Sequence, residues 1–260
     1  MIGMSGPQTY ILLCASALAA GVINSLAGGG TLLTFSALVP VVGPVMANAT
    51  STVALLPGSI AGAWGYRREM SESRQWLRLL IWPSLIGGGV GTLLVTRLEP
   101  KYFARSVPWL ILAAAILFLL QPAISRFAGI GKPHRPPTRV HFAALIAFQF
   151  LVAVYGGYFG AGIGILMLSS LGLMGLADIH RMNAVKTVLA ACINFVSVVI
   201  FTVERDVDWP LACMMATAAI AGGYLGARTA RRMNRNIVRW IVVAIGFTLA
   251  AHYFYQQFAS

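Results

Sequence analysis

Long apolar segments alternate with short polar ones along nearly the whole chain. A helix that crosses about 30 Å of hydrocarbon needs roughly 20 apolar residues. Eight segments reach that length: 8–26, 46–66, 76–96, 102–121, 140–158, 182–203, 208–227 and 236–256. Two shorter apolar segments, 29–42 and 162–176, each follow a glycine cluster. The pattern predicts an all-α polytopic membrane protein in which the short segments are brief crossings or re-entrant half-helices.

The order of these elements repeats. The stretch AGGGTLLTF (27–35) aligns with FGAGIGILM (159–167), and Asn48 and Thr52 align with Asn183 and Thr187 further on. Each half has a glycine break, a short helix and then a helix that begins with asparagine. We therefore predict an N-terminal repeat (1–121), a basic cytoplasmic linker (122–139) and a C-terminal repeat (140–260), with about five membrane segments in each repeat.

The basic residues indicate how the two halves are oriented. Cytoplasmic loops of membrane proteins carry an excess of Lys and Arg. If the short segments do not cross the membrane, nine basic residues lie on each of its two faces. If they do cross, 14 basic residues lie on one face and four on the other, and Lys186 falls inside a span. The second count predicts ten crossings, five per half. An odd number per half inverts the second repeat and places both termini on the non-cytoplasmic side of the cell (inner) membrane.

Composition narrows the functional class. The chain is 58% hydrophobic and 10% charged, with a net charge of +12, whereas soluble domains are about 25% charged. An ordinary soluble enzyme and a nucleic-acid-binding module are therefore excluded. We expect no cofactor, metal site or enzymatic activity, because no nucleotide-binding, nucleophile–base or metal-ligand motif occurs. Without an ATP site, a transporter of this kind would be a secondary carrier.

The two glycine breaks are the first candidate site. Each precedes a short helix, so the amide N–H groups of residues 28–31 and 160–164 could be free to bind an anion at the positive end of the helix dipole. Alternatively, the glycines only permit close helix packing. That second interpretation is the one we adopt for the glycines inside long segments, which are Gly87, Gly88, Gly89, Gly91, Gly222, Gly223 and Gly226.

Polar residues form the second candidate constellation. Asn48 and Ser51 are three positions apart, as are Asn183 and Lys186, so each pair shares a helix face. Lys186 is the only basic residue assigned to the interior of a predicted span, the others lying at helix ends or in loops, which favours a functional role. It could instead reach the surface beside Arg181. Asn24 could donate to a ligand or cap a short helix. All seven carboxylates fall in loops or at helix ends, so no predicted span carries a buried Asp or Glu. This argues against a cation channel, a metal transporter or a carboxylate-driven proton pump and is compatible with an anionic cargo.

The motifs GVINSLAGGGT (21–31) and ANATST (47–52), with YGGYFGAGIG (155–164) and RMNAVK (181–186), resemble the two halves of the TauE/SafE family. The resemblance covers nearly the whole chain. It implies export of sulfite or of small organosulfur anions such as sulfonates and thiosulfate, and thus a small sulfur oxyanion or sulfonate as the substrate. The first break departs from the Gly-Xaa-Gly pattern of the second, since it is an uninterrupted glycine triplet.

Together these observations predict a central site between the two halves that opens alternately to each side of the bilayer. Its expected residues are Asn24, Gly28, Gly29, Gly30, Thr31, Asn48, Thr52, Tyr158, Gly160, Gly162, Asn183, Lys186 and Thr187. A passive anion channel, a carrier of another small organic anion and a membrane-embedded sulfur relay through Cys192 are the alternatives. The partners expected are the substrate and the lipid bilayer, with no nucleic acid; a homodimer is left open.

Overall fold

The protein is described here from a computed structural model, which covers residues 6–26, 28–128, 139–176, 178–204, 206–229 and 235–259. Within these ranges every regular element is a helix. The helices are α1 (Pro7–Leu26), α2 (Thr31–Val42), α3 (Pro44–Gly65), α4 (Arg67–Ser71), α5 (Arg74–Arg97), α6 (Pro100–Phe127), α7 (Arg139–Tyr158), α8 (Ile163–Leu173), α9 (Ile179–Glu204), α10 (Trp209–Thr229) and α11 (Arg235–Ala259).

All ten segments expected from the sequence are helical, and the short α4 is an addition. Six helices (α1, α5, α6, α9, α10 and α11) are long and apolar enough to cross a membrane. Helix α3 is long but carries the polar run from Asn48 to Thr52, of which Asn48, Thr50 and Ser51 are buried within the bundle. A helix buried in this way does not have to be apolar all round. The chain is therefore a multi-pass membrane protein, while the count of ten crossings stays a prediction.

The two sequence halves interlock. Helix α10 of the second half packs against α1 and α3, and α5 of the first half packs against α7 and α9. Helix α3 also contacts α9, and α6 contacts α11. Helices α1, α2, α3, α5 and α6 of the first half correspond in order to α7, α8, α9, α10 and α11 of the second. When each helix is replaced by its counterpart, the same contacting pairs are obtained, so that α1 with α10 becomes α7 with α5. The packing thus has the two-fold pattern that homologous repeats would produce, although the inversion itself remains a prediction.

Glycines allow the interlocking helices to approach. A Cβ added to Gly223 would lie 2.1 Å from the carbonyl oxygen of Gly58, and one added to Gly91 would lie 2.0 Å from that of Val154. No side chain fits at such distances. The close-packing interpretation is confirmed for these glycines and for Gly87, Gly88, Gly222 and Gly226, whereas a Cβ on Gly89 would make only ordinary contact.

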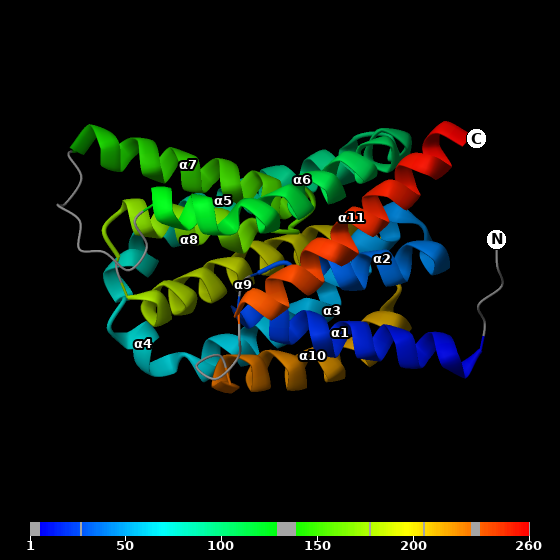
Figure 1. Cartoon of the computed structure of the whole chain (residues 1–260), viewed down its shortest axis with the longest axis horizontal. Coiled ribbons are helices and arrows are strands. Elements are labelled where there is room, and N and C mark those ends of the chain that lie inside the picture. Colours follow the sequence, from blue (N-terminus) through cyan, green and yellow to red (C-terminus); the bar gives the residue numbers. More distant parts are fainter. Residues whose placement is uncertain are drawn as a thin grey trace.

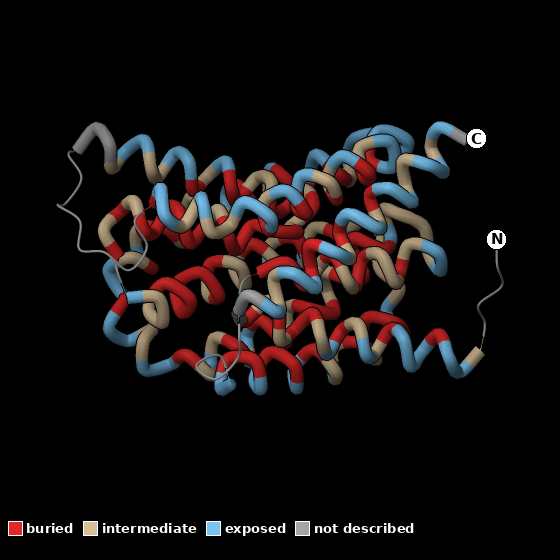
Figure 2. The backbone as a smooth tube through the Cα atoms, in the orientation of Figure 1, coloured by how far each residue is buried: buried red, intermediate tan, exposed pale blue. Residues whose placement is uncertain are grey.

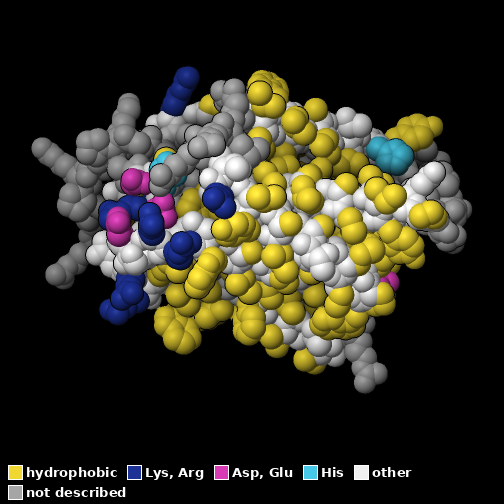
Figure 3. Space-filling view, turned by 90° about the horizontal axis from the view of Figure 1, so that it is seen from below, with side chains coloured by type: hydrophobic (Ala, Val, Ile, Leu, Met, Phe, Trp, Pro, Cys, Tyr) yellow, Lys and Arg dark blue, Asp and Glu magenta, His cyan; other side chains and the backbone are white. Residues whose placement is uncertain are grey.

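The two ends of the bundle differ in charge. The start of α1 and the end of α11 lie at one end, and α4 lies at the other (Figure 1). Figure 3 shows Lys and Arg side chains gathered at the α4 end, which we call the basic end, and a broad hydrophobic surface beyond it. At the opposite end Arg97 pairs with Glu204 at 2.8 Å and Lys101 with Glu99 at 2.5 Å. Both described termini therefore share the end opposite to the basic one.

The middle of the bundle holds its most buried helices. Figure 2 shows buried residues concentrated along the interior. In α8 nine of the 11 residues are buried, from Ile163 to Gly172. Helices α2 and α8 both begin near the middle of the molecule and run toward opposite ends (Figure 1). Their N-termini, and the glycine breaks before them, are thereby brought together in the interior.

Candidate functional site

The two glycine breaks touch each other. Gly28 has φ of +71° and Gly162 has φ of +80°, a conformation that residues with a Cβ rarely adopt. A Cβ on Gly28 would lie 2.7 Å from the Cα of Gly164. The chain therefore needs glycine at Gly28 both for its backbone conformation and for the contact between the breaks.

The amides of the first break are occupied, contrary to expectation. The N–H of Gly28 donates to the carbonyl of Ile23 at 3.1 Å. The N–H groups of Gly29 and Gly30 donate to Asn24 Oδ1 at 2.9 and 2.8 Å. The prediction that these three amides are free is wrong, because the Ile23 carbonyl satisfies the first and the Asn24 side-chain oxygen satisfies the other two in place of a ligand. Asn24 therefore ties down the turn that leads into α2 and does not point a free donor at a ligand.

The second break keeps part of its donors: the expected free amides of Gly160 and Ile163 instead donate to the carbonyls of Tyr155 at 3.2 Å and Gly160 at 3.5 Å. Gly156 stands at the position that aligns with Asn24, so this break has no equivalent side-chain cap. Among the described residues, the amides of Ala161, Gly162 and Gly164 have no hydrogen-bond acceptor. The hydroxyl of Tyr155 donates to the carbonyl of Ala161 at 2.7 Å, which holds the turn in place. The anion-binding potential expected of both breaks is therefore concentrated in the second.

A small cavity lies where the breaks meet α3 and α9. Its volume is about 30 Å³, which is room for a water molecule or two. Seven of the expected site residues line it: Asn24, Gly28, Gly29, Thr31, Gly160, Lys186 and Thr187. The other lining residues are Ser25, Gly58, Ser59, Ile163, Gly164, Ala190 and Asn194. We call this the inner cavity.

Lys186 is the charged group of the inner cavity. Its side chain is buried, at 1% relative exposure, and Nζ donates to the backbone carbonyls of Asn24 at 3.0 Å and Ser25 at 3.4 Å. These carbonyls belong to the last turn of α1, where the helix dipole favours a cation. The alternative that Lys186 reaches the surface beside Arg181 is wrong, because its ammonium turns inward to α1.

Four other expected residues lie just outside the cavity lining. Asn48 and Asn183 are buried, and the structure gives neither Oδ1 a hydrogen-bond partner among the described residues. Asn48 Nδ2 donates to the carbonyl of Tyr158 at 3.1 Å, which ties α3 to the second break. The hydroxyl of Thr52 donates to its own helix, to the carbonyl of Asn48 at 2.8 Å. These contacts support the walls of the site.

Gly30 and Gly162 are also absent from the lining, and both pack against neighbouring helices. A Cβ on Gly30 would lie 2.2 Å from the carbonyl oxygen of Ala20, and one on Gly162 would lie 3.5 Å from Leu117. Conversely, Gly58 and Ser59 of α3 line the cavity without having been expected there. In the sequence they look like the small residues found at any helix contact, and only the fold places them beside Lys186.

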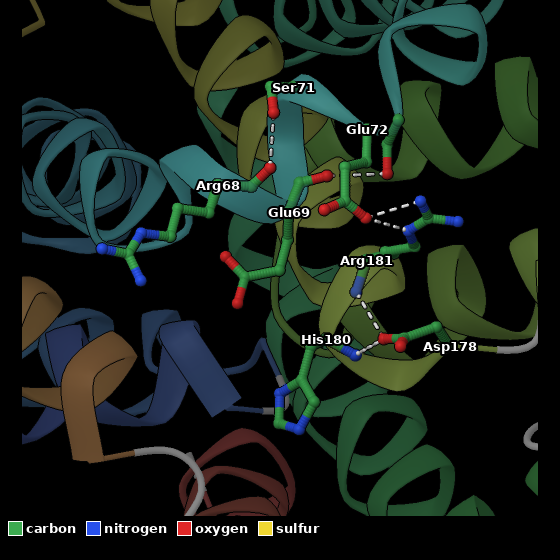
Figure 4. Close-up of polar contacts among 8 residues, drawn as sticks. Arg68, Glu69, Ser71, Glu72, Asp178, His180 and Arg181 are labelled. Atoms are coloured by element: carbon green, nitrogen blue, oxygen red, sulfur yellow. Dashed lines mark hydrogen bonds and ion pairs between the residues drawn. The ribbon is translucent and has the colours of Figure 1, made fainter.

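The start of α9 is anchored at the basic end (Figure 4). Asp178 Oδ1 accepts the N–H groups of His180 at 2.8 Å and Arg181 at 3.0 Å. The bond from Arg181, with a smaller contribution from His180, holds the pKa of Asp178 below its ordinary value. Arg181 also donates to Glu72 Oε2 through Nε, at 2.9 Å. These contacts fix the first turn of the helix that carries Lys186.

The sulfur-relay alternative finds no support in this geometry. Cys192 is half-buried and free, but it does not line the inner cavity; Ala190 and Asn194 of the same helix do. A relay would require its thiol to meet the substrate at the site.

Comparison with known proteins agrees with the architecture. The sequence model of the family described as "Sulfite exporter TauE/SafE" matches residues 13–253. A "Probable membrane transporter protein" from Haemophilus influenzae is 28% identical over 95% of this chain and 94% of its own length. The "Probable membrane transporter protein YfcA" of Escherichia coli K12 is 26% identical over 98% of this chain and 93% of its own length. The "Probable membrane transporter protein YunE" of Bacillus subtilis is 24% identical over 93% of this chain and 97% of its own length.

No solved structure matches the chain. The family assignment therefore rests on the sequence match, which extends from the first half of α1 almost to the end of α11. Because that match takes in both glycine breaks and every described residue of the inner cavity, the chain belongs to the TauE/SafE family of membrane transporters.

Proposed function

We propose that the protein is a secondary transporter that exports a small sulfur-containing anion (sulfite, thiosulfate or an organosulfonate) by alternating access. The observation that carries this proposal is the inner cavity. There the ammonium of Lys186, the amide of Gly164 and the N-terminal ends of α2 and α8 converge. An oxyanion has acceptor oxygens for the ammonium and for the Gly164 amide, while the α2 end, whose break amides are occupied, contributes through its helix dipole.

The electrostatics of the cavity favour an anion. Each helix N-terminus carries about half a positive charge, and two such ends face the same small space. Among its described lining residues Lys186 is cationic and none is a carboxylate. A cation would meet like charge there, whereas an anion would be stabilised by every one of these groups.

The packing favours a carrier over a channel. The inner cavity is small and lies between interlocked halves, and its lining comes from both halves. An exchange of the two-fold related contacts would open it to one side and then to the other. The membrane potential supplies a driving force, because a dianion leaving a negative-inside cell gains about 2 × 2.3 kcal/mol per 100 mV.

The family description supports the choice of cargo. The family is described as "Sulfite exporter TauE/SafE", and the relatives are named as membrane transporters. The family description thus supports a sulfur anion as the cargo, and the relatives support transport. A carrier of another small organic anion would use the same donors.

Flux through proteoliposomes tests the proposal. Labelled thiosulfate should leave the vesicles with saturable kinetics, should be accelerated by thiosulfate on the opposite side, and should compete with sulfite and taurine. Flux without saturation or trans-acceleration would indicate a channel. Competition by acetate or lactate but not by sulfur anions would indicate another organic anion, and binding of no oxyanion would refute the site altogether.

A further inference from the structure

A second cavity opens at the basic end, and neither the sequence motifs nor the proposed site accounts for it. It has a volume of about 510 Å³ and is formed by the end of α3, by α4, by the start of α9 and by the end of α10. We call it the outer pocket. Its size admits an anion together with its hydration water.

Basic side chains dominate this outer pocket. Arg67, Arg68 and Arg228 line it, with His180 and one carboxylate, Glu69, among its described residues. Figure 4 shows Arg68 extending away from Arg181, which turns to Glu72. Guanidinium groups bind oxyanions through paired N–H donors, so the pocket suits the same chemical class of ligand as the inner cavity.

A single layer separates the two cavities. Tyr66 lines the outer pocket and is 3% exposed. Its hydroxyl donates to the backbone carbonyl of Ser25 at 3.3 Å. Ser25 lines the inner cavity, and the same carbonyl accepts from Lys186 Nζ at 3.4 Å. One carbonyl is therefore shared by a donor facing the outer pocket and by the cation of the inner cavity.

The helices continue from one cavity to the other. Ser59 of α3 lines the inner cavity, and Tyr66, which directly follows the last residue of α3, lines the outer pocket. Seven helical residues rise about 10 Å and bring the side chains back to the same face. Gly62 lies between them, and a Cβ there would be 3.1 Å from Ser25 Oγ. The small residue leaves Tyr66, at the end of α3, as the main side chain between the cavities.

We propose that the outer pocket is a second oxyanion-binding site, from which the substrate reaches the inner cavity when the Tyr66 hydroxyl leaves the carbonyl of Ser25. The inference rests on the proposed function and adds the path by which the anion arrives from the basic end. The arginines collect the anion, and the tyrosine separates it from Lys186 in the closed state.

Thiol labelling tests the path without measuring transport. Ser59→Cys is placed in a background with Cys14, Cys192 and Cys213 changed to Ala, and the thiol is labelled with 2-sulfonatoethyl methanethiosulfonate, which carries a sulfonate. Arg68→Gln with Arg228→Gln should slow labelling about tenfold, since two attracting charges are lost. Tyr66→Phe should accelerate it about 2- to 12-fold, because one hydrogen bond no longer holds the barrier.

A matched control separates the pocket from the general charge of this end. Arg74→Gln with Arg78→Gln removes two exposed arginines from the start of α5, neither of which lines the outer pocket. This pair should leave the labelling rate within twofold of the parent. A trimethylammonium reagent should not be slowed by Arg68→Gln with Arg228→Gln. Equal slowing by both arginine pairs would overturn the proposal.

Thiosulfate flux gives the second measurement, which does not depend on folding of the cysteine variant. In phosphatidylcholine vesicles, Arg68→Gln with Arg228→Gln should raise the KM from the basic side about tenfold and leave kcat unchanged. A KM change confined to vesicles with phosphatidylglycerol would mean that the pocket holds a lipid headgroup, which overturns the proposal. If Lys186→Met abolishes flux while the pocket variants behave as the control, only the entrance fails. If Lys186→Met also transports normally, the assignment of the inner cavity fails too, and if the parent protein carries no thiosulfate, the proposed function itself fails.

Discussion

Replacing Lys186 by Met is the most direct test of the inner cavity. Methionine is unbranched like lysine and only one atom shorter, and it lacks the ammonium that donates to the carbonyls of Asn24 and Ser25. A hydrogen bond from a charged group contributes about 1.5–3 kcal/mol. Loss of that bond to a bound oxyanion should raise the Kd about 10- to 150-fold.

Stability should change much less than affinity. The ammonium stabilises the end of α1 by about 0.3–2 kcal/mol, but Lys186 is almost fully buried, so its removal also relieves the cost of desolvating a charge. The two effects oppose each other. We therefore expect Lys186→Met to remain folded, with a thermal midpoint within about 8 °C of the parent protein.

Calorimetric titration of the purified protein with sodium thiosulfate measures this effect. Lys101→Met is the matched control, since it makes the same substitution at an exposed residue of the opposite end, where Lys101 pairs with Glu99. The control should bind with a Kd within twofold of the parent. A folded Lys186→Met protein that binds thiosulfate as tightly as Lys101→Met would refute the assignment of the lysine to the site.

Three further predictions concern the break, the start of α9 and the helix contacts. Gly28→Ala should abolish thiosulfate binding, because its Cβ would lie 2.7 Å from the Cα of Gly164. The control Gly43→Ala has φ of +79° and nothing within 4 Å, so it should lose only about 1–2 kcal/mol of stability and still bind. Equal binding by the two variants would contradict this prediction. Asp178→Ala should lower stability by about 0.5–2 kcal/mol at pH 7. Because the pKa of Asp178 is lower in the folded protein, this loss of stability should be fully present above the unfolded-state pKa of about 3.9 and should vanish as the pH falls through the folded-state pKa. Thermal midpoints of the variant and the parent that move further apart in acid would contradict this prediction. Thr92→Val removes a hydroxyl that lies 3.1 Å from a carbonyl of α7 and 2.6 Å from a hydroxyl of α9. The substitution should lower the free energy of unfolding by about 1–3 kcal/mol, as measured by thermal unfolding. An unchanged midpoint would contradict a stabilising role for this contact.

The helices could be predicted from the sequence because their signals are local. The expected segments 29–42 and 162–176 correspond to Thr31–Val42 and Ile163–Leu173, since a glycine break and an apolar run mark each one. The interlocking of the halves could not be predicted. Nothing in the sequence of α5 indicates that it packs against α7 and α9, because its glycines would suit any close helix neighbour.

The candidate site was predictable where a residue is unusual for its surroundings. Lys186 stands out as a cation within an apolar run, and it does line the inner cavity. The role of Asn24 depended on geometry, since the sequence allowed both a ligand donor and a cap. Ser59 gave no signal, because hydroxyl and glycine residues are frequent at helix contacts in membranes and only the fold selects those beside the lysine.

The exchange of helices between the halves has a consequence for biosynthesis. Helix α5 is complete at Arg97, but α9, against which it packs, ends only at Glu204, 107 residues later. At about 5–20 residues per second the ribosome needs roughly 5–20 s to supply it. During that interval the face of α5 around Gly88, which packs against α9, has no native partner. The first half must therefore wait in the bilayer, held by lipid or by the insertion machinery, until the second half arrives.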